Sequence, residues 1–155
     1  WRIGDTYISS IGQYGFLVTP IQMVRVASAL ATEGKLIKPT IFQGRPLKYT
    51  KINISKEIFR VVNEGMRRGV TDSDGTARAL NIPEVTVAAK TGTAELGVSK
   101  KLVNSWGIGY FPYENPRFAF ALVMEKGSRE NSVGANLVIR NLLIWMAGNT
   151  PEYIK

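Results

Sequence analysis

The chain has 155 residues, of which 45% are hydrophobic and 21% charged, and it contains neither cysteine nor histidine. This composition is typical of a folded globular domain, and it excludes cysteine nucleophiles, disulfides, histidine-based triads and zinc bound by histidine or cysteine. The net charge of +8 favours an anionic partner, but the basic residues are spread along the whole chain, so we expect no nucleic-acid binding.

The first half of the chain is predicted to contain two helices. Residues 1–19 are rich in glycine and serine, and we predict irregular structure there. A helix should begin at Thr19 and Pro20, since threonine is a good N-cap and proline fits the first helical position, and should end near Gly34. Ser55 is predicted to cap a second, amphipathic helix. The apolar stripe of this helix would consist of Ile58, Val61, Val62 and Met66.

Beyond Pro83 the spacing of apolar residues changes from helical to extended. Three runs rich in β-branched and aromatic residues are predicted strands, at 85–93, 103–111 and 117–125. Their short connections indicate antiparallel pairing. A largely apolar helix is predicted at 133–148, packed over the sheet. The expected fold class is α+β, an antiparallel β-sheet of three strands flanked by helices.

A polar loop follows the second predicted helix, with the sequence TDSDGTA. Asp72 and Asp74 precede Gly75 in a register that does not match a calcium loop, and no glutamate closes such a loop. We therefore expect an ordinary turn and no metal site.

The stretch VAAKTGTAEL, residues 87–96, breaks the apolar pattern at the end of the first predicted strand. Side chains alternate along a strand, so Lys90 and Gly92 should point to one side and Thr91 and Thr93 to the other. Gly92 weakens a strand by roughly 0.5–1 kcal/mol, which favours a position that a ligand or another chain approaches closely. A substrate that lies along this strand would receive backbone hydrogen bonds, with a cation nearby and hydroxyls able to hold a carboxylate. The alternative is a strand that ends in a polar turn, with the lysine in solvent.

Four blocks of sequence, in their order and spacing, closely resemble the penicillin-binding proteins. They are residues 4–39, the triplet GTA at 75–77, VAAKTGTAE at 87–95 and residues 104–127. Within that family the chain is most similar to the C-terminal part of the transpeptidase domain of the elongation-type class B enzymes. The resemblance implies a transpeptidase fold like that of serine β-lactamases, with residues 1–155 as the C-terminal portion of a single domain. The sequence departs from the family at three positions: Tyr14 interrupts the motif Gly-Gln-Gly, Ala89 stands where the family has glycine, and Gly107 stands where it has phenylalanine.

The resemblance also implies a serine acyl-enzyme, with Lys90 and Thr93 as catalytic residues and Thr91, Gly92 and Thr93 as substrate-binding residues. In this family the lysine controls proton traffic around serine hydroxyls, and the threonines bind the carboxylate of the substrate. The backbone N–H of Thr93 would be one donor of the oxyanion hole. The expected reaction is the cross-linking of peptidoglycan stem peptides, without a cofactor, at the periplasmic face of the bacterial cytoplasmic membrane. Expected partners are stem peptides, β-lactam antibiotics, the rest of the domain and scaffold proteins of cell elongation.

The two other motifs of the family, Ser-x-x-Lys and Ser-x-Asn, do not occur in the sequence. These residues alone are therefore predicted to be inactive. Because the chain begins with Trp1, we expect a longer protein whose preceding segment supplies the nucleophilic serine. The family places further strands beside the third predicted strand, so without them an edge at 118–124 would be exposed.

Three other functions share some of these features. A serine β-lactamase or D,D-carboxypeptidase also carries Lys-Thr-Gly, and the dependence of its acyl-enzyme on an amine acceptor would distinguish it from a transpeptidase. A non-catalytic penicillin-sensing domain would bind the antibiotic without turnover. A basic interaction module would bind DNA in a salt-sensitive manner.

Overall fold

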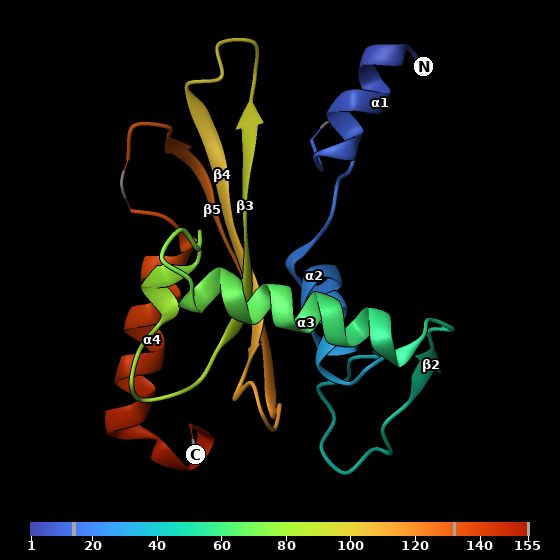
Figure 1. Ribbon diagram of the computed structural model, residues 1–155, viewed down its shortest axis with the longest axis vertical. Coiled ribbons are helices and arrows are strands. Elements are labelled where there is room, and N and C mark those ends of the chain that lie inside the picture. Colours follow the sequence, from blue (N-terminus) through green and yellow to red (C-terminus); the bar gives the residue numbers. More distant parts are fainter. Residues whose placement is uncertain (14, 132, 155) are drawn as a thin grey trace.

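A computed structural model describes residues 1–13, 15–131 and 133–154, and within them the predicted α+β class is confirmed (Figure 1). The main sheet is antiparallel, with the strand order β3 (Ala88–Leu96), β4 (Leu102–Phe111) and β5 (Phe118–Ser128). The helices are α1 (Ile3–Ser10), α2 (Pro20–Ala31), α3 (Lys56–Thr71) and α4 (Ala135–Asn149), and short 3-10 turns occupy Arg78–Leu80 and Pro151–Tyr153. Tyr14, where the sequence departs from the family motif, lies outside the described residues.

Helices cover both faces of the main sheet (Figure 1). On one face α4 packs through Ile139, which shares a buried cluster with Ala89 of β3. On the other face the end of α2 packs against a second cluster, which contains Ala88 and Tyr110. Consecutive residues of β3 thus enter different cores, because side chains alternate along a strand. The prediction that the last helix packs over the sheet is confirmed.

The helix α3 crosses the first part of the free edge of β3 (Figure 1). Arg67 Nη1 donates a hydrogen bond of 3.0 Å to the carbonyl oxygen of Val87. A Cβ placed on Gly69 would lie 3.4 Å from the carbonyl oxygen of Ala89. The carbonyl groups of Val87 and Ala89 therefore face α3, and the rest of β3 continues beyond the helix.

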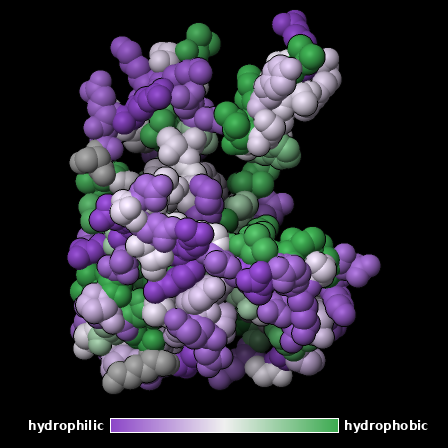
Figure 2. All heavy atoms as spheres, viewed as in Figure 1, coloured by the Kyte–Doolittle hydropathy of each residue, from purple (hydrophilic) through white to green (hydrophobic). Residues whose placement is uncertain are grey.

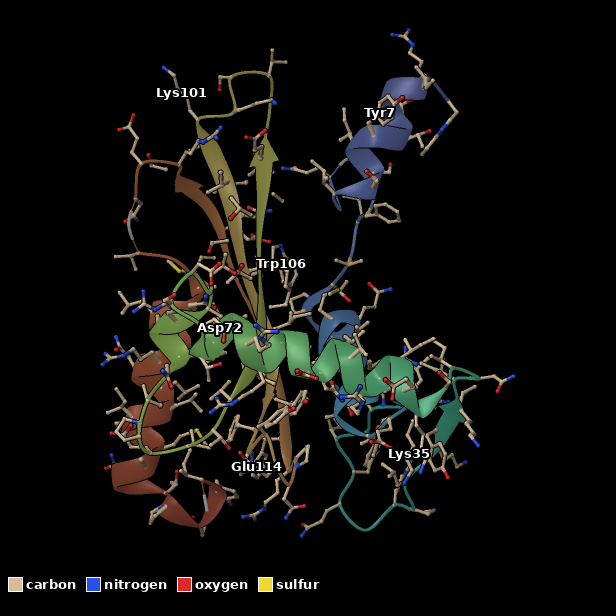
Figure 3. All side chains as sticks on the ribbon, in the orientation of Figure 1. Tyr7, Lys35, Asp72, Lys101, Trp106 and Glu114 are labelled. Atoms are coloured by element: carbon tan, nitrogen blue, oxygen red, sulfur yellow. The ribbon has the colours of Figure 1, made fainter. Side chains whose placement is uncertain are left out.

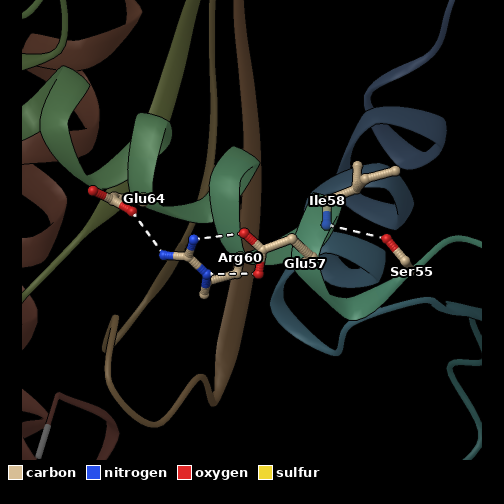
Figure 4. A network of polar contacts seen from close by, with 5 residues as sticks. All are labelled: Ser55, Glu57, Ile58, Arg60 and Glu64. Atoms are coloured by element: carbon tan, nitrogen blue, oxygen red, sulfur yellow. Dashed lines mark hydrogen bonds and ion pairs between the residues drawn. The ribbon is translucent and has the colours of Figure 1, made fainter.

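As predicted, α3 begins after Ser55, whose hydroxyl accepts a hydrogen bond of 3.4 Å from the backbone N–H of Ile58 (Figure 4). One turn further, Arg60 forms ion pairs with Glu57 at 2.6 Å and with Glu64 at 3.3 Å. All three of these charged side chains are solvent-exposed, so the pairs add little stability and mainly keep this face of the helix polar.

The apolar stripe predicted for α3 is mostly wrong. Met66 is buried as expected, but the other buried side chains of the helix are Phe59 and Val70. Ile58 and Val61 are 54% and 55% exposed. The helix has apolar residues on two adjoining faces, and periodicity alone does not reveal which face the sheet will cover.

The prediction of irregular structure for residues 1–19 is wrong for α1. Asp5, in the first turn, accepts a hydrogen bond of 2.8 Å from the backbone N–H of Arg2, and this local contact stabilises a helix start despite the nearby glycine and serines. No residue of α1 is buried. Apolar side chains gather on α1 and on the segment that follows it (Figure 2).

The strand β3 begins three residues later than predicted and continues to Leu96. The extension forms because Thr93 pairs with Ser105 and Leu96 with Leu102 across the hairpin. Lys-Thr-Gly therefore lies inside the strand, not at its end as predicted. The β3–β4 hairpin projects beyond α2, α3 and α4, with Lys101 near its tip (Figure 3). The bounds of β4, β5 and α4 differ from the predicted ones by at most three residues.

A second, smaller hairpin was not predicted. It consists of β1 (Lys35–Ile37) and β2 (Tyr49–Lys51), which are too short to show an alternating pattern. Among the described helices, none is long and apolar enough to cross a lipid bilayer.

Glu95 connects the end of β3 to two basic side chains. Its carboxylate forms ion pairs with Lys100 at 3.0 Å and with Arg129 at 2.7 Å. The hydrogen bond from Lys100, followed by the charges of both cations, holds the pKa of Glu95 below its usual value of 4.5. This stabilisation is present above pH 4.5 and is lost as the pH falls through the lowered pKa.

We predict that an NMR titration of the Glu95 carboxyl group gives a midpoint below 4.5, and that Lys100→Met moves this midpoint back towards 4.5. The cause is the loss of the Lys100 contact, which makes the largest contribution to the lowering of this pKa. A wild-type midpoint at or above 4.5, or one that Lys100→Met leaves unchanged, would contradict the ion-pair geometry.

Gly109 of β4 lies close to the backbone of β3 and to a side chain of β5. A Cβ at this position would overlap the carbonyl oxygen of Ala88 and would lie 2.7 Å from Cζ of Phe120. We predict that Gly109→Ala lowers the free energy of unfolding by about 1–3 kcal/mol, because the backbone of β3 must move. The matched control is Gly127→Ala in β5, where the nearest atom would lie 4.0 Å away. Thermal unfolding of both variants in the intact protein measures the difference, and equal melting temperatures would refute the prediction.

Candidate active site

The free edge of β3 is the central feature of the candidate site. The N–H and C=O of one residue in a strand point to the same side, and alternate residues point to opposite sides. Since the carbonyl of Ala89 faces away from β4, the backbone groups of Thr91, Thr93 and Glu95 must do so as well. Beyond α3 the strand thus presents a row of backbone donors and acceptors that β4 does not use.

Lys90 lies on the same face of the sheet as Ala88, and its side chain is exposed. Its Nζ donates a hydrogen bond of 2.6 Å to the carbonyl oxygen of Thr91, which belongs to the free edge. Within residues 1–13, 15–131 and 133–154, no carboxylate forms an ion pair with Lys90. The ammonium group therefore stands beside the edge with its charge uncompensated by the described residues, where an anionic ligand could bind it.

Thr91 and Thr93 line a cavity of about 500 Å³ on the face that α4 covers. The hydroxyl of Thr91 donates a hydrogen bond of 2.9 Å to the hydroxyl of Thr76, which precedes the 3-10 turn Arg78–Leu80. Ser105 lies on the neighbouring strand and also lines the cavity. Several hydroxyl groups from three segments of the chain therefore surround one space.

The start of α4 forms the opposite wall of this cavity. The backbone N–H of Ala135 donates a hydrogen bond of 3.0 Å to the hydroxyl of Ser105, which ties the helix to β4. The amide oxygen of Asn136 is buried and has no hydrogen-bond partner among the described residues. The N-terminal end of a helix carries a partial positive charge, so the hydroxyls and the helix start together suit a carboxylate ligand.

Gly92 faces the side chain of Trp106 across the hairpin. A Cβ on Gly92 would lie 3.3 Å from Cβ of Trp106, so a larger residue would require Trp106 to shift by a few tenths of an ångström. We expected a ligand or another chain to approach this glycine closely. In the described structure, the group that does so is the side chain of Trp106. Figure 3 shows this tryptophan near the middle of the hairpin.

A larger cavity, of about 880 Å³, lies beside the β1–β2 hairpin. Its lining residues are Ile21, Lys38, Pro39, Thr40, Ile41, Phe42, Arg45, Pro46 and Lys48. They combine an apolar surface with three basic side chains and include no carboxylate or amide. Because a catalytic site needs convergent polar groups, we place the candidate site at the smaller cavity beside β3.

Three residues of the site were not predicted as such. Thr76 belongs to the quoted GTA triplet, so its position in the sequence was the available signal. No feature of the sequence marks Asn136 as a site residue, because its position beside the cavity depends on how α4 packs against the sheet. Gln13 reaches the edge of β3 from the segment after α1, and its contact joins residues 80 positions apart.

The comparisons with known proteins agree with this geometry. Residues 3–143 match the family described as the penicillin binding protein transpeptidase domain. The chain is 27% identical to the peptidoglycan D,D-transpeptidase MrdA of Haemophilus influenzae, over its whole length and 28% of that protein. It therefore spans about a quarter of the length of this relative.

Solved structures give the same result. Penicillin-binding protein 2 of Helicobacter pylori superposes with a TM-score of 0.75 at 33% identity, covering 98% of this chain and 27% of the other. The complex of the H. pylori protein with MreC gives a TM-score of 0.76 at 32% identity, covering 98% of this chain and 28% of the other. The Lys-Thr-Gly strand, the polar cavity beside it and these matches lead to one assignment: the chain belongs to the penicillin-binding protein transpeptidase domain family.

Proposed function

We propose that this chain is the C-terminal portion of the transpeptidase domain of a peptidoglycan D,D-transpeptidase. The observation that carries the proposal is the free edge of β3, at which Lys90, Thr91 and Thr93 surround one segment of backbone. The similarity to a relative named peptidoglycan D,D-transpeptidase supports the same reaction.

In the proposed reaction the donor stem peptide, which ends in D-Ala–D-Ala, lies along β3 as an added strand. Its terminal carboxylate is held by the hydroxyls of Thr91 and Thr93 in the cavity, while Lys90 stands on the other face of the strand. The carbonyl oxygen of the scissile bond accepts a hydrogen bond from the backbone N–H of Thr93, which faces the free edge. One such donor contributes about 3–4 kcal/mol to the stability of the transition state.

The chemistry then proceeds in two steps. A serine oxygen from outside this chain bonds to the carbonyl carbon, the peptide C–N bond breaks, and D-alanine leaves with the proton that the serine gave up. The amine of a neighbouring stem peptide next attacks the ester carbon, which forms the cross-link and returns a proton to the serine. Lys90 acts as a fixed positive charge that favours the anionic intermediates of both steps.

The rest of the domain would supply the Ser-x-x-Lys and Ser-x-Asn motifs and further strands. The outer edge of β5, at 118–124, pairs with no other strand among the described residues. Apolar side chains on α1 and on α3, such as Ile3 and Ile58, are also exposed. We assign these surfaces to contacts with the missing portion of the domain.

The intact protein is proposed to act at the periplasmic face of the cytoplasmic membrane and to bind β-lactams covalently at the serine. The H. pylori protein has been solved as a complex with MreC, which supports an elongation scaffold protein as a partner of the intact protein here.

A fluorescent penicillin tests the proposal directly. We expect covalent labelling of the intact protein and none of the isolated 155 residues, because the sequence contains no Ser-x-x-Lys. Gel fluorescence measures the labelling, and transfer of the acyl group to an added D-amino acid distinguishes a transpeptidase from a β-lactamase or a carboxypeptidase. An unlabelled intact protein would refute the proposed function.

Lys90→Ala should slow acylation of the intact protein by at least about a hundredfold, because the charge that stabilises the anionic intermediate is lost. The matched control is Lys101→Ala, near the tip of the hairpin (Figure 3), which should leave the rate within about twofold. The second-order rate constant of acylation by benzylpenicillin measures both effects. Comparable acylation rate constants for the two variants would show that Lys90 is not a catalytic residue.

A further inference from the structure

Gln13 occupies part of the free edge of β3. Its Nε2 donates a hydrogen bond of 3.3 Å to the carbonyl oxygen of Thr93, and its Oε1 accepts one of 3.2 Å from the backbone N–H of Glu95. A side-chain amide has the same donor and acceptor as a peptide group. One glutamine therefore makes two hydrogen bonds that two different residues of an added antiparallel strand would make at this place, one through its N–H and the other through its C=O.

The segment that carries Gln13 packs little against the rest of the described structure. The backbone N–H of Gln13 donates to the carbonyl of Ile8 at 3.1 Å, so the end of α1 positions it. Gly12 and Gly15, on either side, have φ angles of +77° and +82°, which favour glycine, and a Cβ on either would meet open space. No side chain of α1 is buried. Turning the Gln13 side chain away from β3 therefore disturbs no core of the described chain.

The carbonyl of Thr93 is also the acceptor that a donor peptide needs. If a peptide lies along β3 with its scissile carbonyl at the N–H of Thr93, its preceding N–H reaches the Thr93 carbonyl, as in a regular antiparallel pair. Gln13 Nε2 holds this acceptor in the ligand-free chain. The glutamine and the amide of the donor peptide thus require the same oxygen atom.

We infer that Gln13 competes with the donor peptide for the edge of β3. The donor must displace the Gln13 side chain and bind the Thr93 carbonyl through an amide N–H of its own. This inference rests on the proposed function, because it concerns the same edge. Ligands that carry an amide N–H at this place compete with Gln13, and ligands without one do not.

Acylation of the intact protein by two β-lactams tests the inference. Benzylpenicillin has a side-chain amide N–H at the required place, whereas imipenem has a hydroxyethyl group and no such amide. Gln13→Ala should raise the second-order rate constant for benzylpenicillin by about threefold to tenfold, the effect of removing one or two weak hydrogen bonds from the competing state. The rate constant for imipenem should stay within about twofold.

Two further variants show whether the change in rate comes from the Gln13 contact itself or from a general effect of the substitution on folding. Gln13→Asn keeps the amide but is too short to reach both Thr93 and Glu95, so it should act in the same direction as Gln13→Ala. Gln43→Ala, in the exposed loop between β1 and β2, is the matched control and should change neither rate constant. Hydrogen exchange reports the contact independently of acylation, since the Glu95 amide should exchange faster in Gln13→Ala than in the wild type.

The outcomes separate the inference from the proposed function. A lower rate constant for benzylpenicillin in Gln13→Ala, or equal changes with both antibiotics, would overturn the competition and assign Gln13 a supporting role. Unchanged exchange at Glu95 would overturn the contact. If neither antibiotic acylates the wild type, the proposed function fails first, and the competition for a donor peptide fails with it.

Discussion

The unpaired backbone of β3 is the constraint on which the rest of the structure depends. An edge strand with free N–H and C=O groups can pair with any extended chain, and proteins usually cover or charge such edges. Here α3 covers the edge at Val87 and Ala89, and Gln13 bonds to it at Thr93 and Glu95. The segment between them, around Thr91, is left for a ligand, with the Lys90 ammonium beside it.

The alternation of side chains lets one short strand serve two environments at once. Ala88 and Ala89 enter opposite cores, which fixes the strand between α2 and α4. The same alternation places Thr91 and Thr93 in the cavity at the start of α4, while Lys90 stands on the other face. The hydroxyls and the ammonium group can then contact different parts of one ligand, because they lie on opposite faces of a strand that both cores anchor at Ala88 and Ala89.

The described chain leaves several apolar surfaces and one sheet edge uncovered. These surfaces are the exposed residues of α1, the Ile58 face of α3 and the outer edge of β5. The chain spans about a quarter of the length of its relatives. Both facts accord with the proposal that the serine-bearing portion of the domain packs on these surfaces and completes the cleft beside β3.

The sequence by itself determined the caps of α2 and α3, the three antiparallel strands and the Lys-Thr-Gly triplet, because these depend on residues close together along the chain. Only the tertiary structure decided which face of α3 is buried and that β3 continues to Leu96 opposite Leu102. It also brought Thr76 and Gln13 to β3 from 15 and 80 residues away. Such contacts follow from how the helices dock on the sheet, and local propensity carries no information about that geometry.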